Sequence, residues 1–288
     1  FLLCGVLFSC SSPDLVFVSD QYWSETDLAF IMNDGAAAGD SLDNISVIDI
    51  LLPFDNPVEL AEKIRSSRGK TFLLSPLISQ YGPQLARQMG DRVFAGFDMA
   101  ILAGEIPENL IKITTDRGDA FRAAGELCKN YLNDPANTGS KVAGLFYSGS
   151  ATRVKERDAF VQGIGIDVNQ DRFFIKSFPR LASISEANTF LNDLKTQNVG
   201  LYVVSMSSLS KDLVSSISLQ SSSLIITERI GYGNVYADRM IASVEEHWAE
   251  AVLKVIDART DVISVETTLK AGPASQEIQS SWLDIFRR

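Results

Sequence analysis

Histidine and cysteine, which bind zinc and take part in much nucleophilic catalysis, are scarce in this sequence. The chain has one histidine, His247, and three cysteines, Cys4, Cys10 and Cys128. These are too few for a Cys/His zinc site, and the cysteines lack the Cys-x-x-Cys spacing of a redox pair. A Ser-His-Asp triad would need His247 as its base, but that residue stands in an acidic, amphipathic stretch that predicts a helix. We therefore expect no metal, no cofactor and no catalytic residue.

The sequence also lacks the patterns that bind phosphate groups. Gly163-Ile164-Gly165 and Gly231-Tyr232-Gly233 each supply a G-x-G, but neither is followed by the third glycine of a dinucleotide-binding loop. The 26 basic and 36 acidic residues give a net charge of −10 and a pI near 4.7. Because nucleic-acid binding usually requires a basic face, we expect neither a nucleotide cofactor nor a nucleic-acid partner.

Polar and aromatic residues gather just past the carboxyl ends of predicted strands. These candidates are Asp20, Gln21, Tyr22, Trp23, Ser75, Asp98, Asp116, Ser148, Met206 and Glu228. Open α/β sheets bind ligands at this edge. Aromatic rings beside planar hydrogen-bonding groups suit a small polar ligand that has one flat apolar face. Each residue alone has an ordinary alternative, because Asp and Ser at strand ends also cap helices, and Tyr22 and Trp23 could cover a junction between lobes.

Nine short β-rich runs would position these candidates. They are Leu15–Ser19, Ile45–Leu52, Thr71–Leu74, Arg92–Phe97, Ile111–Thr115, Val142–Tyr147, Arg172–Phe178, Leu201–Ser205 and Leu224–Thr227. The runs are continuously apolar, which is typical of parallel strands covered by helices on both faces.

Helix starts can be recognised between these runs. Asn56-Pro57-Val58-Glu59 offers an N-cap, a proline at N1 and an acidic N3 residue, and Asp116 can cap the helix after the fifth run. Ser183-Ile184-Ser185-Glu186 and Ser243-Val244-Glu245-Glu246 both match the capping box. This alternation of strands and helices predicts an α/β protein. At about 150 residues per domain, 288 residues fit two domains, which we expect to be doubly wound parallel-sheet lobes joined by multiple crossovers.

The N-terminal residues resemble a secretion signal. Residues 1–10 are almost wholly apolar, and ten residues rise only about 15 Å as a helix, too little to cross a bilayer. Leu7-Phe8-Ser9-Cys10 resembles a bacterial lipobox, which implies that Cys10 is lipidated and that residues 1–13 are a signal-peptide remnant and tether. An ordinary cleaved signal peptide or an apolar strand is the alternative. Cys128 would then be unpaired, and we expect it to be a small buried hydrophobic residue.

The order and spacing of these elements resemble the type I periplasmic-binding fold, which ribose-binding-like receptors share with the effector domains of LacI-type repressors. Asp20-Gln21-Tyr22-Trp23 resembles the end of the family's opening strand and its aromatic pair, and Asp98 stands where its fourth strand commonly ends in Asp. Asp116 resembles the family's crossover segment. Glu228-Arg229 replaces the usual Asp after the ninth strand.

The opening of the second lobe carries part of the same resemblance. Residues 141–150, followed by Arg153 or Arg157 and then Phe160, resemble the family's strand–Gly–Arg–aromatic unit. The register leaves open which of the two arginines faces the ligand.

The resemblance implies a division into lobes. The first lobe would comprise residues 14–112 and 236–260, and the second would comprise residues 113–235 and 261–288. The chain would cross between them near residues 112–116, 228–236 and 259–265, and hinge motion there would close the lobes on a ligand.

The function implied by the resemblance is capture of a small polar solute, a sugar first and a nucleoside second, for an ABC-type permease. The protein would be a monomeric, lipid-anchored, non-enzymatic receptor on the periplasmic or extracellular face of a bacterial envelope. Its ligand-binding residues would be Asp20, Tyr22, Trp23, Ser75, Asp98, Asp116, Ser148, Arg153, Arg157, Met206 and Glu228. The alternative is an envelope sensor or adaptor whose cleft no longer binds a transported ligand, to which the Ser-rich residues 205–223 would also be suited.

Overall fold

Two units, each with its own sheet, make up the chain in this computed structural model. The structure describes residues 13–20, 45–50, 57–75, 78–97, 99, 106–149, 151–165, 170–178, 183–206, 209–228, 237–257, 262–277 and 280–287. The first unit comprises Phe1–Thr114 and Trp248–Val265, and the second comprises Thr115–His247 and Glu266–Arg288.

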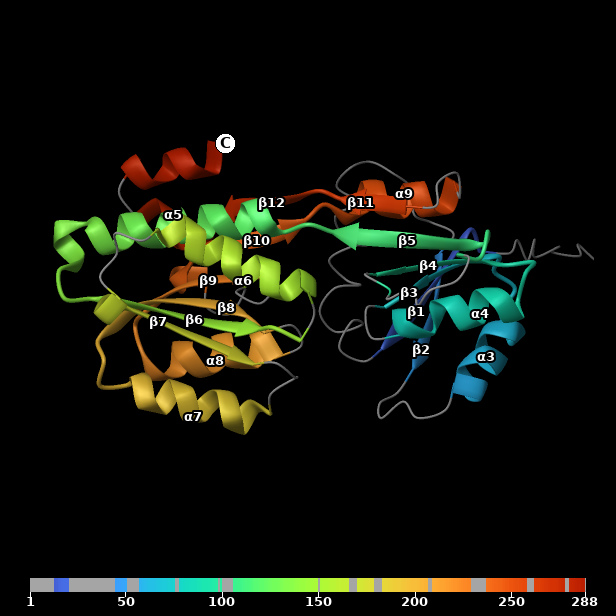
Figure 1. Ribbon diagram of the computed structural model, residues 1–288, viewed down its shortest axis with the longest axis horizontal. Helices are drawn as coiled ribbons and strands as arrows, with labels where there is room; N and C mark the ends of the chain where they lie inside the picture. The colour runs from blue at the N-terminus through green and yellow to red at the C-terminus, as the bar shows by residue number, and fades with distance from the viewer. Residues whose placement is uncertain are drawn as a thin grey trace, which may run out of the picture. The chain divides into compact units, whose positions relative to one another are not determined.

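The first unit contains a six-stranded sheet with the order β11-β5-β4-β3-β1-β2 (Figure 1). Its strands are β1 (Leu15–Asp20), β2 (Ile45–Ile50), β3 (Thr71–Leu74), β4 (Val93–Phe97), β5 (Leu110–Thr115) and β11 (Val262–Val265). All the pairings from β2 through β1, β3 and β4 to β5 are parallel. The described helices of this unit are α3 (Pro57–Ser66), η2 (Ser79–Tyr81), α4 (Gly82–Gln88) and α9 (Trp248–Asp257).

Helices cover both faces of this sheet, which is why its strands are largely apolar. In β1, Leu15 and Phe17 pack with Val252 of α9, whereas the alternate residues Val16 and Val18 pack in the cluster that contains α3 and α4. All six residues of β1 are buried.

The second unit contains a six-stranded sheet with the order β12-β10-β9-β8-β6-β7. Its strands are β6 (Lys141–Tyr147), β7 (Phe173–Phe178), β8 (Val199–Ser205), β9 (Leu224–Glu228), β10 (Met240–Glu246) and β12 (Thr267–Ala271). The pairings from β7 to β10 are parallel, and β12 is antiparallel to β10. The order therefore leaves β7 and β12 at the two edges.

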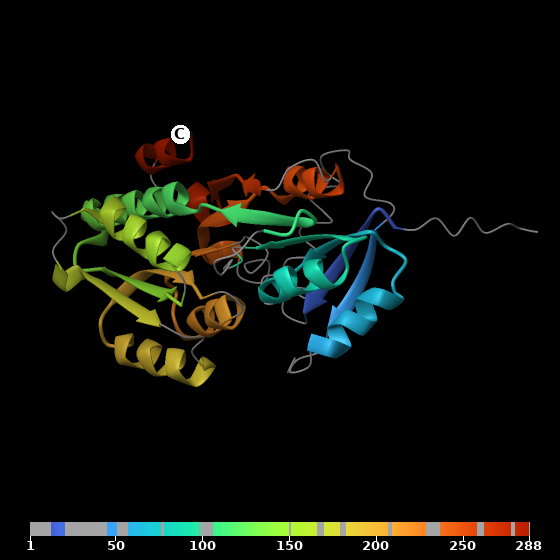
Figure 2. The ribbon, with the colours of Figure 1, turned by 45° about the vertical axis from the view of Figure 1, so that its right-hand side comes forward.

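Helices lie on both faces of the second sheet as well. They are α5 (Gly118–Asn133), α6 (Ala151–Ile164), α7 (Ile184–Leu194) and α8 (Ser210–Gln220), with short 3-10 turns η3 (Pro135–Asn137), η4 (Gln170–Arg172), η7 (Ala237–Arg239), η8 (Pro273–Glu277) and η9 (Ser280–Arg287). Figures 1 and 2 show α5 and α6 side by side on one face and α7 with α8 on the other. No described helix has both the length and the apolar character that crossing a membrane requires.

Two glycines let α5 and α6 approach each other closely. A Cβ atom on Gly125 would overlap the carbonyl oxygen of Phe160, and one on Gly163 would overlap the carbonyl oxygen of Arg122. Gly163, the first glycine of a G-x-G pattern, thus serves helix packing. This contact joins the C-terminal half of α6 to the first half of α5.

All nine predicted strands are present, and the capping box at Ser183 is confirmed, with both of its hydrogen bonds formed. The second predicted capping box, Ser243-Val244-Glu245-Glu246, is wrong because these residues belong to strand β10. Every residue of β10 is buried, and Ser243 Oγ donates to Glu245 Oε1 at 2.6 Å instead of capping a helix. Helix α9 begins at Trp248, so His247 precedes it.

The lobe boundaries differ from those predicted. Residues 236–260 were assigned to the first lobe, but β10 pairs with β9 and β12 in the second sheet. The second crossing therefore falls between His247 and Trp248 and not near 228–236. Residues 262–265 form β11 of the first sheet, so the third crossing falls between Val265 and Glu266.

Candidate functional site

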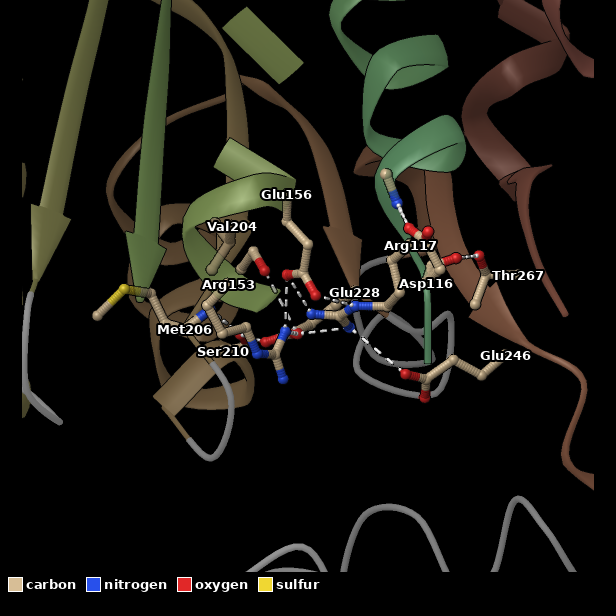
Figure 3. Close-up of polar contacts among 12 residues, drawn as sticks. Asp116, Arg117, Arg153, Glu156, Val204, Met206, Ser210, Glu228, Glu246 and Thr267 are labelled. Carbon is tan, nitrogen blue, oxygen red and sulfur yellow. Dashed lines mark hydrogen bonds and ion pairs between the residues drawn. The ribbon is translucent and has the colours of Figure 1, made fainter. Parts of the chain in front are cut away.

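Charged and hydroxyl side chains meet at the carboxyl edge of the second sheet. Ser205 and Glu228 are the last residues of β8 and β9, and Ser210 is the first residue of α8. Arg117 immediately precedes α5, and Arg153 and Glu156 lie in the first two turns of α6. We call these six residues the polar edge cluster, and Figure 3 labels all of them except Ser205. Parallel strands bring their carboxyl ends to one edge, which is why residues so distant in sequence meet there.

Arg117 lies at the centre of the polar edge cluster and is almost completely buried, with 1% of its surface exposed. Its Nε and Nη2 donate to the two carboxylate oxygens of Glu156 at 2.9 and 2.7 Å. Its Nη1 donates to Glu228 Oε2 at 2.9 Å. The guanidinium carbon also lies 5.3 Å from the centre of the Phe121 ring, within the range of a cation–π contact. The guanidinium of Arg117 therefore contacts two carboxylates and one aromatic ring.

Four side chains of the described residues donate to the carboxylate of Glu228. Its Oε2 accepts from Arg117 Nη1 and Arg153 Nη1, both at 2.9 Å, and from Ser205 Oγ at 3.4 Å. Its Oε1 accepts from Ser210 Oγ at 2.6 Å, and Ser210 Oγ in turn accepts from the Met206 amide at 2.8 Å. A buried carboxylate with this many donors is held in one orientation.

Arg153 is the member of the cluster that reaches furthest toward solvent. Its side chain is 21% exposed, whereas those of Arg117, Glu156 and Glu228 are 1 to 3% exposed. Its Nη1 contacts Glu156 Oε2 at 3.1 Å as well as Glu228. The competing residue Arg157 instead pairs with its neighbour Asp158 and contacts Ser177 Oγ at 3.5 Å. Of the two candidate arginines, the structure brings Arg153 to Glu228.

Burial and charge act in opposite directions on the groups of this cluster. Burial alone would lower the pKa of Arg117, but the carboxylates of Glu156, Glu228 and Glu246 outweigh it and raise that pKa above its ordinary value. Burial raises the pKa of Glu156 to about 7, although the charge of Arg117 opposes this shift. Arg117 is therefore a permanent cation, and Glu156 is the carboxyl group that titrates near neutral pH. Among the described residues no group of acidic, His or Cys side chains could hold a metal ion.

The other predicted ligand-binding residues occupy several positions. In the first unit, Ser75 Oγ donates to Asp20 Oδ2 at 2.5 Å, and both residues are buried at the carboxyl ends of β3 and β1. Asp116 is exposed, and its Oδ1 accepts from the Gly118 amide at 2.9 Å; the N-cap position of α5 is occupied by Arg117 and not, as predicted, by Asp116. Ser148 is half-buried after β6, and Met206 is fully buried in the core that includes α8.

Several predicted residues lie outside the described part of the chain. They are Cys10, Gln21, Tyr22, Trp23, Asp98 and Arg229. Cys128 is described, unpaired and fully buried in α5, and burial raises the pKa of its thiol, so its prediction as a buried hydrophobic residue is confirmed.

Sequence reasoning did not identify Arg117, Glu156, Ser205 or Ser210 as members of a site. One signal was present for Glu156. It shares the buried stripe of α6 with Ala159, Phe160 and Gly163, and a charged residue on an apolar helix stripe requires a buried partner.

The chain matches no protein-family model and no curated protein sequence. Solved structures do resemble it over most of its length. An ABC-transporter solute-binding protein from Aeropyrum pernix K1 has a TM-score of 0.64 and 11% identity, covering 88% of this chain and 75% of that one. A transcriptional activator of the comK gene from Bacillus halodurans has a TM-score of 0.66 and 13% identity, covering 95% and 94%. The fold is that of the type I periplasmic binding proteins.

A further structure with the type I periplasmic-binding fold was solved with a sugar. It is a periplasmic solute-binding protein from Actinobacillus succinogenes 130z with bound D-allose, with a TM-score of 0.62 and 13% identity, covering 93% of this chain and 100% of that one. The predicted fold class is thus confirmed. Because the neighbours include both solute receptors and transcription regulators, the fold does not decide the function.

Proposed function

We propose that this protein is a solute receptor that captures a small polar molecule outside the cytoplasm for an ABC-type importer. The observation that carries this proposal is the polar edge cluster at the carboxyl edge of the second sheet. This is the edge where open α/β sheets bind ligands, and Arg153, its most exposed member, is held in place by Glu156 and Glu228. A guanidinium fixed in this way is a preorganised hydrogen-bond donor, which lowers the entropic cost of binding.

We propose a sugar as the first class of solute and a nucleoside as the second. Structures of similar fold were solved with D-allose and with L-arabinofuranose, and their hydroxyl groups suit charged hydrogen-bonding partners. Tyr22 and Trp23 remain the proposed stacking residues, and Asp98 a proposed polar contact. Charged hydrogen bonds contribute roughly 1.5–3 kcal/mol each, so a few of them with stacking support micromolar affinity, which corresponds to about 8 kcal/mol.

The remaining parts of the proposal concern location and partners. Lipidation of Cys10 would anchor a monomer to the envelope membrane, and residues 11–13 would form the tether. The permease of an importer would then receive the solute.

Thermal melting of the full chain across a panel of aldoses, ketoses and nucleosides tests this proposal. We expect one member to raise the melting temperature, and native mass spectrometry to detect the same molecule bound one to one. Arg153→Gln should reduce the affinity at least tenfold, because one charged hydrogen bond of about 1.5–3 kcal/mol is lost.

Arg157→Gln is the matched control, since it removes the same group from the same helix four residues away. It should leave the affinity within about twofold, because exposed pairs such as Arg157–Asp158 contribute little. A loss of affinity in Arg157→Gln with none in Arg153→Gln would overturn this assignment. A panel without any binder would contradict the solute receptor itself.

The hydrogen bonds that Glu228 already accepts from the protein favour a second candidate function, that of an envelope sensor or adaptor. The four protein donors on this carboxylate already occupy the usual capacity of a ligand-binding acid. A sensor of this kind would give no melting shift with any solute, and would bind the extracellular domain of a membrane receptor and not a permease.

A further inference from the structure

The crossing ends of the second unit are hydrogen-bonded to one another. We use this name for residues 116–117, 246–247 and 266–268, which adjoin the three crossings. Thr267 Oγ1 donates to the carbonyl oxygen of Asp116 at 2.6 Å, and the His247 amide donates to the carbonyl oxygen of Glu266 at 2.9 Å. The His247 ring nitrogen Nε2 lies 3.0 Å from Thr268 Oγ1. The three ends therefore form one connected group inside this unit.

Arg117 belongs both to this group and to the polar edge cluster. Its nitrogen Nη1 lies 2.9 Å from Glu228 Oε2, at the solute edge, and 3.8 Å from Glu246 Oε1, at a crossing end (Figure 3). The contact with Glu228 is a hydrogen bond, whereas the contact with Glu246 is an ion pair that is too long for a hydrogen bond. Nε and Nη2 both donate to Glu156, so a tilt of the planar guanidinium about these two bonds would move Nη1 away from Glu228 and toward Glu246.

The oxygen that accepts from Arg117 Nη1 in the polar edge cluster, Glu228 Oε2, also accepts from other donors. Glu228 Oε2 accepts from Arg117, Arg153 and Ser205 at once. A solute hydroxyl that bonds to Glu228, or that redirects Arg153, changes this balance directly. Interactions within one hydrogen-bond network are not additive. The loss of one hydrogen bond to Glu228 therefore alters the strength of its remaining hydrogen bonds.

We propose that Arg117 is a positioning residue that couples solute capture at the polar edge cluster to the crossing ends. Occupancy weakens the bond from Arg117 Nη1 to Glu228 and strengthens its pair with Glu246, which orders the hydrogen bonds around His247. This inference rests on the proposed function for its solute, but the exchange of partners by Nη1 is a property of the chain alone. A network of this kind couples two sites when one element has two arrangements that both sites bias.

A double-mutant cycle tests the exchange without any solute. Hydrogen exchange is measured on peptides that contain the His247 and Gly118 amides, in the wild type, Glu228→Gln, Glu246→Gln and the double variant. Glu228→Gln removes the charge that competes for Nη1, so we expect the His247 amide to exchange about fivefold more slowly, the lower end of ordinary coupling between sites. In the Glu246→Gln background the same substitution should have no such effect. Equal effects of Glu228→Gln in both backgrounds would overturn the proposal.

A second arm uses the solute found in the melting panel. Because coupling between two sites is reciprocal, Glu246→Gln should lower the affinity for the solute by about the same fivefold, and the solute should no longer slow exchange at His247. Glu266→Gln, an exposed acid at another crossing end, is the matched control and should keep both responses. If the solute still slows exchange at His247 in Glu246→Gln, the coupling is overturned. A panel without a binder contradicts the proposed function, and the double-mutant cycle then decides the role of Arg117.

Hydrogen exchange in β8 reports whether each variant is folded. If Glu228→Gln does not fold, the measurement on Glu246→Gln with solute decides whether Arg117 couples the two sites.

Discussion

Arg117 is a cation with almost no contact with water, and such a group is tolerated only where carboxylates surround it. Its partners Glu156 and Glu228 lie 39 and 111 positions away in the sequence. No local pattern predicts a pairing over such distances, because it depends on which strands become neighbours. Glu228 was a candidate because it ends an apolar strand, whereas the family resemblance nominated both Arg153 and Arg157 and left open which of them faces the ligand. Of the groups that hold Glu228 and Arg153, Glu156 alone had a signal in the sequence, its place on the apolar stripe of α6.

Glu156 should make stability depend on pH in an unusual direction. Its folded-state pKa of about 7 lies above the ordinary value of 4.5, so between these values the folded protein binds more protons than the unfolded chain. Its contribution is therefore fully present below about pH 4.5 and is lost as the pH rises through 7. A difference of this size corresponds to on the order of 3 kcal/mol. Relative to Glu156→Gln, the unfolding free energy of the wild type in urea should fall by that order between pH 4.5 and pH 8.

Glu59→Gln is the control for this pH series, because Glu59 is exposed on α3 and pairs with the exposed Lys63. It should follow the wild type at every pH. A constant difference between wild type and Glu156→Gln across the range would show that burial does not control this carboxyl group.

Strands were easier to predict than any other element, for a physical reason. Runs such as Leu15–Asp20 are buried on both faces, and continuous apolar sequence is what this environment selects. The elements that were missed depart from that pattern. β10 carries Ser243, Glu245 and Glu246, which imitate a helix start, and its acids are buried only because partners surround them. In β11 the burial alternates along Val262–Val265, as expected of an outer strand with one exposed face.

The contact between α5 and α6 should be intolerant of a single methyl group. Gly163→Ala places a Cβ against the Arg122 carbonyl oxygen, so the helices must separate. Overpacking of this kind costs about 1–3 kcal/mol, more than the roughly 1 kcal/mol that alanine gains in a helix. Urea denaturation should therefore show a lower midpoint.

Gly90→Ala is the comparison for Gly163→Ala. Its Cβ would have no atom within 4 Å, so the unfolding free energy should change by less than about 0.5 kcal/mol. Equal effects at both positions would show that the close approach of the helices is not what limits residue 163.

Each unit is assembled from separated stretches of sequence, so neither is complete until the chain has returned to it. The second unit needs Glu266–Arg288, which supplies β12 and the 3-10 turn η9. The length of the chain and its alternation of strands and helices were enough to predict two lobes with several crossovers. The first crossing falls within the predicted residues 112–116, but the second was misplaced, because β10 could be assigned to a sheet only once its partners were known.

Trp282, on the final stretch of the chain, should control how often the second unit opens. It is 5% exposed and meets the Tyr131 ring at a centroid distance of 5.9 Å, in the cluster that buries Cys128. Trp282→Ala should cost about 3–5 kcal/mol, so alkylation of Cys128, followed by peptide mass spectrometry, should accelerate roughly a hundredfold or more.

Leu219→Ala is the control for this labelling, because Leu219 is 78% exposed on α8. It should leave the rate at Cys128 nearly unchanged. Slow labelling in Trp282→Ala would mean that the final stretch does not hold this core together.

The sheet order has a consequence for crowded molecules. The outermost strands of the second unit, β7 and β12, carry the exposed lysines Lys176 and Lys270. If a second copy extended the sheet by backbone pairing with one of these strands, the ammonium groups of the lysines would come together where the two copies meet. These two side chains therefore act against fibre-like growth, whatever the protein binds.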